Sequence, residues 1–153
     1  MNNEFKNTIN YLKELLTSDT RVKTVTHGVS NDIDLDKKTI YPLAHIQVLS
    51  FNPVYQMGMI SFLFEIHILK IRDIAKVPSL DKWVRNDNEL DNYNTCVNIA
   101  NKLFANLKNY NTNDIELVSQ TTPEIISLEF MNMLDGCKFQ IELGITNQVD
   151  GCN

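Results

Sequence analysis

The sequence predicts an α+β fold: a mixed or antiparallel β-sheet built on a long central hairpin, with two helices packed on one face. Residues 40–51 and 56–71 form two long apolar runs separated by the turn-like Asn52-Pro53. In the second run the even positions from Ile60 to Ile68 are large and apolar, whereas the polar residues fall on odd positions. This period of two is typical of strands with one face on a core. Two segments with helical spacing flank the hairpin and should cover that face, leaving the other half open.

The N-terminal segment predicts a helix, a short strand and a polar loop. Apolar residues of segment 4–17 share one helical stripe, and residues 21–26 form a short β-type run. The loop at 28–38 has three alternate aspartates, but an EF-hand requires Gly at its sixth position and Glu at its twelfth. Those positions hold Lys37 and Leu43, so we expect a solvated loop without calcium. The helical stripe consists of Phe5, Ile9, Leu12 and Leu16.

Residues 72–89 form the longest stretch without clear periodicity, and they contain Trp83, the single tryptophan. Connections longer than about 12–15 residues are uncommon in compact domains and usually have a function. Two interpretations remain open at this point. Trp83 pins a surface loop against its own domain, or the segment is an arm that reaches a neighbour, since Trp is enriched in interface anchors.

The C-terminal half predicts a helix at 90–110 and strands at 115–119, 125–134 and 137–145. Asp135-Gly136 indicates a hairpin turn, because Gly readily adopts positive φ. Cys96 is expected to be a small buried residue of the helix. The apolar stripe of this helix comprises Leu90, Tyr93, Val97, Ala100, Phe104 and Leu107, and its opposite side carries Asn92, Asn94, Asn98 and Lys102.

The composition indicates a single globular domain spanning residues 1–153, with an extended arm at about 72–89. A net charge of -5 argues against gripping nucleic acid, which needs clustered Lys and Arg. Three cysteines without a CxxC spacing favour a reducing compartment and argue against a disulfide framework or a structural zinc site. Neither a signal region nor an apolar run of membrane-spanning length is present, so we expect cytoplasmic synthesis and no membrane contact.

The best candidates for chemistry are His45, Glu65 and His67 on the mixed face of the hairpin, where a turn near residues 53–56 would bring the two histidines together. Two His and one carboxylate can bind iron or zinc. Their neighbours suit a contact surface better, because Met-rich surfaces adapt to partners. These neighbours are Met57, Met59, Leu63 and Leu69. With no nucleophile elbow and no Gly-rich phosphate loop, we expect a non-enzymatic binding or assembly module without metal or cofactor.

Three features of the chain are similar to a known family. They are the element order, the segment Lys38-Thr39-Ile40-Tyr41-Pro42-Leu43-Ala44-His45-Ile46, and the Asn-Asp-Asn-Glu-Leu approach to the second helix together with Leu-Asp-Gly-Cys at 134–137. In these features the chain resembles the tail terminator or tail completion proteins of bacteriophages, the ring-forming components of the head–tail neck. Relatives often carry an aromatic residue after that Gly, whereas this chain has Cys137.

The resemblance implies a structural virion protein, assembled in the bacterial host cytoplasm, with no catalytic residues. Its homo-oligomeric ring would lie at the head–tail junction or the tail end, surround the DNA channel without gripping DNA, and contact other neck, portal-adaptor or tail proteins. A ring needs heterologous contacts that close by rotation. We expect these contacts to involve Trp83 and Arg85 in the arm, and Met57, Met59 and Leu63 on the mixed face.

Two other classes of function remain as alternatives. A non-viral protein–protein binding module would use the same mixed hairpin face for a single partner and stay monomeric. A small metalloenzyme built on His45, Glu65 and His67 is the less favoured alternative, and stoichiometric bound metal would support it.

Overall fold

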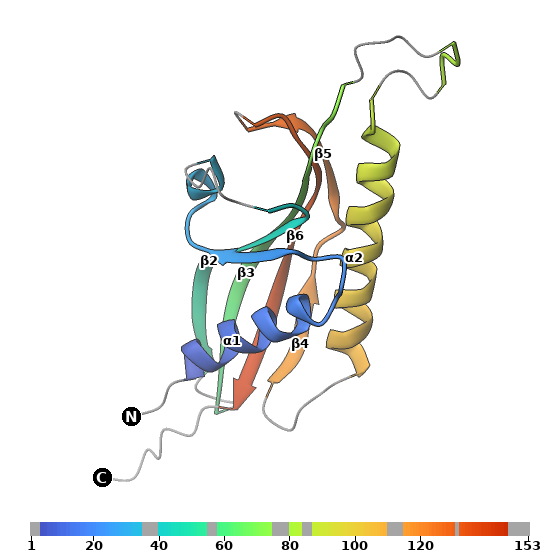
Figure 1. Ribbon diagram of the computed structural model, residues 1–153. Coiled ribbons are helices and arrows are strands. Elements are labelled where there is room, and N and C mark those ends of the chain that lie inside the picture. The colour runs from blue at the N-terminus through green and yellow to red at the C-terminus, as the bar shows by residue number, and fades with distance from the viewer. Residues whose placement is uncertain are drawn as a thin grey trace.

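The computed structural model describes residues 4–34, 40–54, 58–74, 80–83, 87–109, 115–130 and 132–146. None of the helices in these ranges is long and apolar enough to cross a membrane. The elements confirm an α+β fold with a mixed sheet (Figure 1). In chain order they are α1 (Glu4–Thr17), β1 (Thr24–His27), the 3₁₀ helix η1 (Ser30–Asp34), β2 (Leu43–Val54), β3 (Met59–Ile71), α2 (Glu89–Asn109), β4 (Ile115–Gln120), β5 (Glu124–Glu129) and β6 (Leu134–Thr146).

The sheet has the strand order β1-β2-β3-β6-β4, and β5 also pairs with β6. β2, β3 and β6 are antiparallel neighbours, which confirms the central hairpin. β1 runs parallel to β2 and pairs with it only over Leu43–Ile46, so the sheet is mixed. β4 and β5 pair with opposite ends of β6 and together form the second edge of the sheet.

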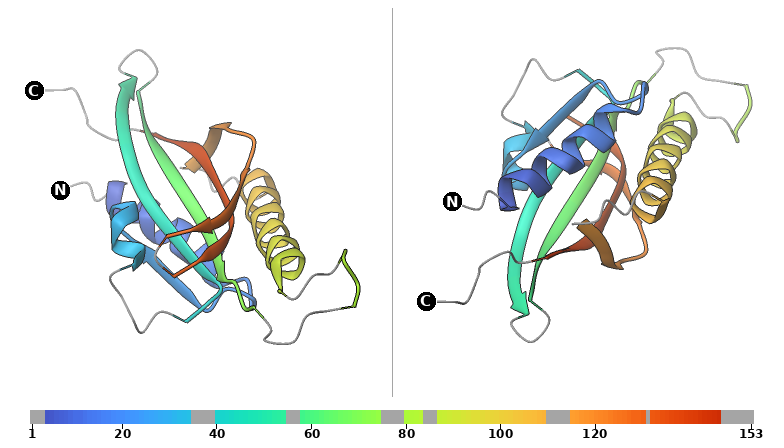
Figure 2. Two further views of the ribbon diagram at one scale, coloured as in Figure 1. Left: turned by 90° about the horizontal axis from the view of Figure 1, so that it is seen from above. Right: turned by 90° about the horizontal axis from the view of Figure 1, so that it is seen from below.

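Both helices cover the same face of the sheet, as Figures 1 and 2 show and as the sequence predicts. The even positions of β3 point into this core, which confirms the period-two alternation. Burial of these side chains supplies the main driving force for folding, about 25 cal/mol per Å² of apolar area. The core includes Leu12 and Leu16 of α1, Phe62, Phe64, Ile66 and Ile68 of β3, Leu103 and Leu107 of α2, and Phe139, Ile141 and Leu143 of β6.

The other face of the sheet is covered at one end. A second apolar cluster lies there, between η1 and the turn that leads into β6. Leu69, which the sequence places on an open contact face, is fully buried in it. The expected half-open face is therefore open only toward the opposite end of β3. The cluster consists of Ile33, Leu43, Leu69, Ile126 and Leu134, with Tyr41 and Phe130 packed against it.

The expected turn at Asn52-Pro53 is wrong. Both residues lie in β2, where Asn52 pairs with Ser61 and Pro53 with Ile60. The connection to β3 falls at residues 55–58, of which the structure describes only Gly58, with φ 59°. Proline lacks an N–H and is tolerated in strands mainly at edges, and no described strand pairs with the outer side of β2 at this point.

The predicted helix at 90–110 is observed as α2, but its buried side differs from the expected stripe. Leu90 and Val97 are 53% and 39% exposed, whereas Asn92, expected on the solvent side, is fully buried. The apolar spacing alone fits two overlapping stripes of the helix. The observed stripe is the one that lets Asn92 donate a hydrogen bond to the buried carboxylate of Asp135. Cys96 is buried, as expected. The buried side comprises Asn92, Cys96, Ile99, Ala100, Leu103 and Leu107.

The hairpin turn expected at Asp135-Gly136 is also wrong, because both residues lie within β6. The chain reverses earlier, where Phe130 and Met133 have positive φ. Gly136 is required for a different reason: a Cβ at this position would overlap the backbone carbonyl oxygen of Ile68 on β3. Glycine inside a strand often marks such a close approach of another backbone.

Candidate interaction surfaces

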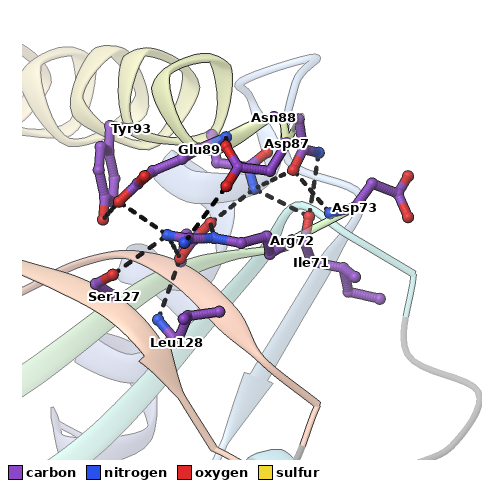
Figure 3. A network of polar contacts seen from close by, with 11 residues as sticks. Ile71, Arg72, Asp73, Asp87, Asn88, Glu89, Tyr93, Ser127 and Leu128 are labelled. Carbon is purple, nitrogen blue, oxygen red and sulfur yellow. Dashed lines mark hydrogen bonds and ion pairs between the residues drawn. The ribbon is translucent and has the colours of Figure 1, made fainter. Parts of the chain in front are cut away.

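A buried ion pair fixes the base of the segment between β3 and α2 (Figure 3). Arg72 lies just after β3, and its side chain is 5% exposed. Its Nε and Nη2 donate to the two carboxylate oxygens of Asp135, at 2.8 and 2.7 Å. Nη2 also lies 2.9 Å from Glu89 at the start of α2. This forked geometry is the strong form of an arginine–carboxylate contact.

Asp135 is fully buried and receives two further hydrogen bonds, from the Asn92 amide at 3.1 Å and from the Leu128 N–H at 3.2 Å. Burial alone raises the pKa of a carboxyl group, but the hydrogen bonds from Arg72, Asn92 and Leu128 outweigh it and hold the pKa of Asp135 below its usual range. The hydrogen bond to Asp135 likewise raises the pKa of Arg72. Both groups are therefore charged at neutral pH.

Asn88 ties the two ends of the segment together. Its Oδ1 accepts from the Asp73 N–H at 2.7 Å, and its Nδ2 donates to the Ile71 carbonyl oxygen at 3.3 Å. An isolated β-bridge also joins Ile74 to Asp87. Arg72 and Glu89, at the two ends of the expected segment 72–89, belong to an anchored base, and the arm extends between Ile74 and Asp87.

The described part of the arm exposes its apolar side chains. Leu80 is fully exposed and Trp83 is 80% exposed. Residues 80–83 lie beyond the start of α2, at one end of the sheet (Figure 1). Trp83 thus does not pin the segment against the described part of its own domain, which leaves the arm interpretation. Arg85, the other predicted contact in this segment, lies outside the described residues.

The mixed face holds Met59 and Leu63, and both are half-buried. The methyl end of Met59 lies over Gly144 of β6, next to Val118 of β4. Met57 lies outside the described residues. Polar side chains of this face bond to one another: Glu142 accepts from Ser61 at 2.6 Å and from Ser119 at 3.1 Å, and Gln140 donates to Glu65 at 3.2 Å.

His45, Glu65 and His67 come together as the sequence predicts. The imidazole rings of His45 and His67 are cross-strand neighbours with centroids 6.3 Å apart. His67 Nε2 lies 3.2 Å from Glu65, while His45 contacts the Thr26 hydroxyl at 2.8 Å and the Gly28 carbonyl oxygen at 3.3 Å. Burial lowers the pKa of both histidines, although Glu65 partly opposes this effect at His67.

These contacts engage three of the four imidazole nitrogens, and only His67 Nδ1 has no hydrogen-bond partner. Within the described ranges, no group of three His, Cys, Asp or Glu side chains is arranged to hold a metal ion. The two histidines and Glu65 are packed, hydrogen-bonded side chains between β2, β3, β1 and the residue after β1.

A further apolar surface, which the sequence reasoning missed, lies beside α1. Two neighbouring hollows of about 460 and 470 Å³ share Phe5 as a wall. The second lies between α1 and the far half of β2, where Phe5 and Phe51 are 45% and 66% exposed. The unbroken apolar pair Val48-Leu49 was the available signal, because it interrupts the alternation where the register of β2 shifts.

No family model matches the sequence, and no curated protein matches it.

Proposed function

We propose that this chain is a structural protein of a bacterial virus, a tail terminator or tail completion protein. Its copies would form a closed ring at the head–tail junction or the tail end, around the DNA channel. The observation that carries the proposal is the arm, which holds Leu80 and Trp83 almost fully exposed on a base fixed by the buried pair of Arg72 and Asp135. The resemblance of the sequence to ring-forming neck proteins supports the same function.

The arm has the physical properties of an interface anchor. Tryptophan is enriched among the residues that contribute most to binding, where its large side chain fills a pocket on the partner. An anchored base restricts the arm before binding, so less conformational entropy is lost when the contact forms. A contact between an arm and a different surface of an identical copy is heterologous, and such contacts generate rings when the rotation closes.

The charge of the chain suits a channel wall. A net charge of -5 disfavours persistent contact with phosphates, so DNA could pass through such a ring without being held. On this proposal the protein has no catalytic role and needs no cofactor. Its partners are further copies of itself and other neck, portal-adaptor or tail proteins, and it assembles in the bacterial cytoplasm before it becomes part of the virion.

The test is the size and shape of the assembled protein. We expect light-scattering chromatography and negative-stain images of the wild type to show a closed ring, alone or after co-expression with neck and tail proteins. Trp83→Ala should abolish the ring and leave the circular dichroism and the melting temperature of the monomer unchanged, because Trp83 is 80% exposed. Ile125→Ala, at an exposed apolar residue of β5, is the matched control and should still form rings.

Absence of any closed ring under both conditions would overturn the proposal. A chain that stays monomeric but captures one protein partner would instead support a binding module. Stoichiometric metal in the purified protein, lost on substitution of His45 or His67, would support the metalloenzyme alternative.

A further inference from the structure

The far half of β2 has an open edge. β1 covers β2 only over Leu43–Ile46, and one further backbone hydrogen bond runs from the Gly28 N–H to the Ile46 carbonyl oxygen. Beyond that point β2 continues to Val54, and among the described strands only β3 pairs with it. Exposed strand edges invite contact with other chains, and proteins normally cover or blunt them.

The side chains beside this open edge are apolar. Val48, Leu49 and Phe51 are 36%, 38% and 66% exposed, and with Phe5 of α1 they line the hollow of about 470 Å³. The Phe5 ring packs on Phe62 with centroids 5.4 Å apart, so one wall of the hollow is fixed by the core. Ligand pockets commonly have volumes of about 300–1,000 Å³, so a hollow of this volume is large enough for an indole ring.

The arm and this hollow lie at opposite ends of the same chain. The three views of Figures 1 and 2 place residues 80–83 beyond the start of α2 and the far end of β2 at the other end of the sheet. Phe51 pairs with Phe62, nine strand residues or about 30 Å from Ile71, whereas Trp83 is four residues or at most about 14 Å from Asp87 at the base of the arm. Trp83 therefore cannot reach the far half of its own β2. The exposed apolar side chains at the two ends can therefore meet only between two molecules.

We propose that the arm segment Leu80 to Trp83 of one copy docks into the hollow between α1 and the far half of β2 of the next copy. Each molecule then donates its arm at one end and receives a neighbour's arm at the other. This inference names the contact between neighbouring copies in the proposed ring. It rests on the proposed function only because it requires that copies of the chain associate.

Charge permits this contact, because Glu4 is the one charged residue among the described residues that line this hollow, and Lys6 lines the neighbouring hollow. The arm carries both signs, with Asp81 and Lys82 between its two apolar residues. The docked arm would cover the apolar edge of β2 and bury the Trp83 ring. A buried aromatic side chain removes about 150–250 Å² from water, which makes it a major part of the binding energy.

The hollow is a better receiving surface than the mixed face proposed from the sequence. Met59 and Leu63 on the mixed face are half-buried, and the polar side chains around them already bond to one another. Phe51, in contrast, is 66% exposed and has a hollow beside it. More apolar area is therefore available for burial at the edge of β2.

A matched pair of substitutions separates the two faces. Phe51→Glu places a charge in the hollow, and Val118→Glu places the same charge on the mixed face beside Met59, at a side chain that is 50% exposed. We expect Phe51→Glu to weaken self-association by about 30-fold or more, as for a central interface residue. Val118→Glu should leave association unchanged, and both variants should keep the wild-type circular dichroism spectrum.

A mixing experiment tests the head-to-tail geometry. The Trp83→Ala variant has a defective arm and an intact hollow, and the Phe51→Glu variant has the reverse. Each alone should be monomeric, but an equimolar mixture should form one-to-one dimers and nothing larger, since only one productive contact can form. Sedimentation velocity distinguishes these species.

The outcomes separate this inference from the proposed function. Wild-type rings that survive Phe51→Glu, or that are lost in Val118→Glu alone, overturn the docking site and leave the ring standing. Open chains that depend on both Phe51 and Trp83 support the docking site and overturn the ring. Wild-type protein that is monomeric at every concentration, or a mixture of variants that gives no dimer, overturns the docking inference.

Discussion

At the scale of single residues, the buried carboxylate of Asp135 links several elements of the fold. This carboxylate is fully buried and accepts hydrogen bonds from two nitrogens of Arg72, from Asn92 and from the Leu128 N–H. It thereby joins β6 to the end of β3, the first turn of α2 and the end of β5. A charge in such a position is stabilising only while its partners remain in place.

We predict that Asp135→Asn destabilises the fold by about 3–5 kcal/mol, because it leaves the buried guanidinium of Arg72 without its main counter-charge. The measurement is the free energy of unfolding in urea. Glu124→Gln is the control: Glu124 lies 3.5 Å from Lys138, but its side chain is 73% exposed, so the loss should stay below about 1 kcal/mol. Equal effects of the two substitutions would contradict the role assigned to Asp135.

A second residue-scale prediction concerns His45 and His67. Burial lowers the folded-state pKa of both below the ordinary value near 6.5. The unfolded state therefore binds more protons as the pH falls, and the stability that the neutral rings contribute is fully present above about pH 6.5 and is lost below it. We expect a lower free energy of unfolding at pH 5.5 than at pH 7.5.

The slope, rather than the absolute stability, identifies the groups responsible. His67→Gln should flatten the pH dependence even if it also lowers stability at pH 7.5. Ile125→Ala, at an exposed residue that does not titrate, is the control and should leave the slope as it is in the wild type. An unchanged slope in His67→Gln would show that other groups titrate in this range.

At the scale of elements, the fit of β6 against β3 depends on one glycine. A Cβ on Gly136 would overlap the Ile68 carbonyl oxygen, a backbone atom that cannot rotate away. Gly136→Ala should therefore cost about 1–3 kcal/mol or more, as overpacking does in cores. At Gly144 of the same strand a Cβ would meet the ends of the Met59 and Val118 side chains, which can shift, so Gly144→Ala should cost clearly less. Urea unfolding of the two variants checks this order.

The sequence was sufficient to predict the helices and strands whose apolar periodicity has a single interpretation. α1 was predicted with its observed bounds, and the even positions of β3 were predicted to face the core. In α2 the existence of the helix was predicted, but its buried side was not, because Asn92 is buried for a partner 43 residues away. The dipeptide Asp135-Gly136 indicated a turn for a related reason. The buried carboxylate of Asp135 and the close approach of the Ile68 backbone to Gly136 are long-range contacts, and these have no local sequence signature.

The interaction surfaces were predictable only in part, for a similar reason. The sequence left two interpretations of Trp83 open, and its 80% exposure in the structure favours the arm. The hollow beside β2 was not predicted, because it forms where α1 packs at an angle across the sheet and where β1 ends after four residues. Both properties depend on tertiary packing. The closeness of His45 and His67 was predictable, because the alternation places both on one face and a turn in the middle of the hairpin brings them together.

At the scale of the whole molecule, the balance between net charge and apolar contact predicts how assembly responds to salt. Each copy has a net charge of -5, so copies repel one another at low ionic strength. The docking of Leu80 and Trp83 into the hollow is mainly apolar and is not weakened by screening.

We therefore expect self-association to strengthen as sodium chloride rises from about 0.02 to 0.3 M, over which the Debye length falls from roughly 20 Å to below 10 Å. Light scattering at fixed protein concentration measures the change, and Phe51→Glu is the control that should remain monomeric throughout. Association that weakens with salt would show that opposite charges, rather than the arm and the edge of β2, hold the copies together.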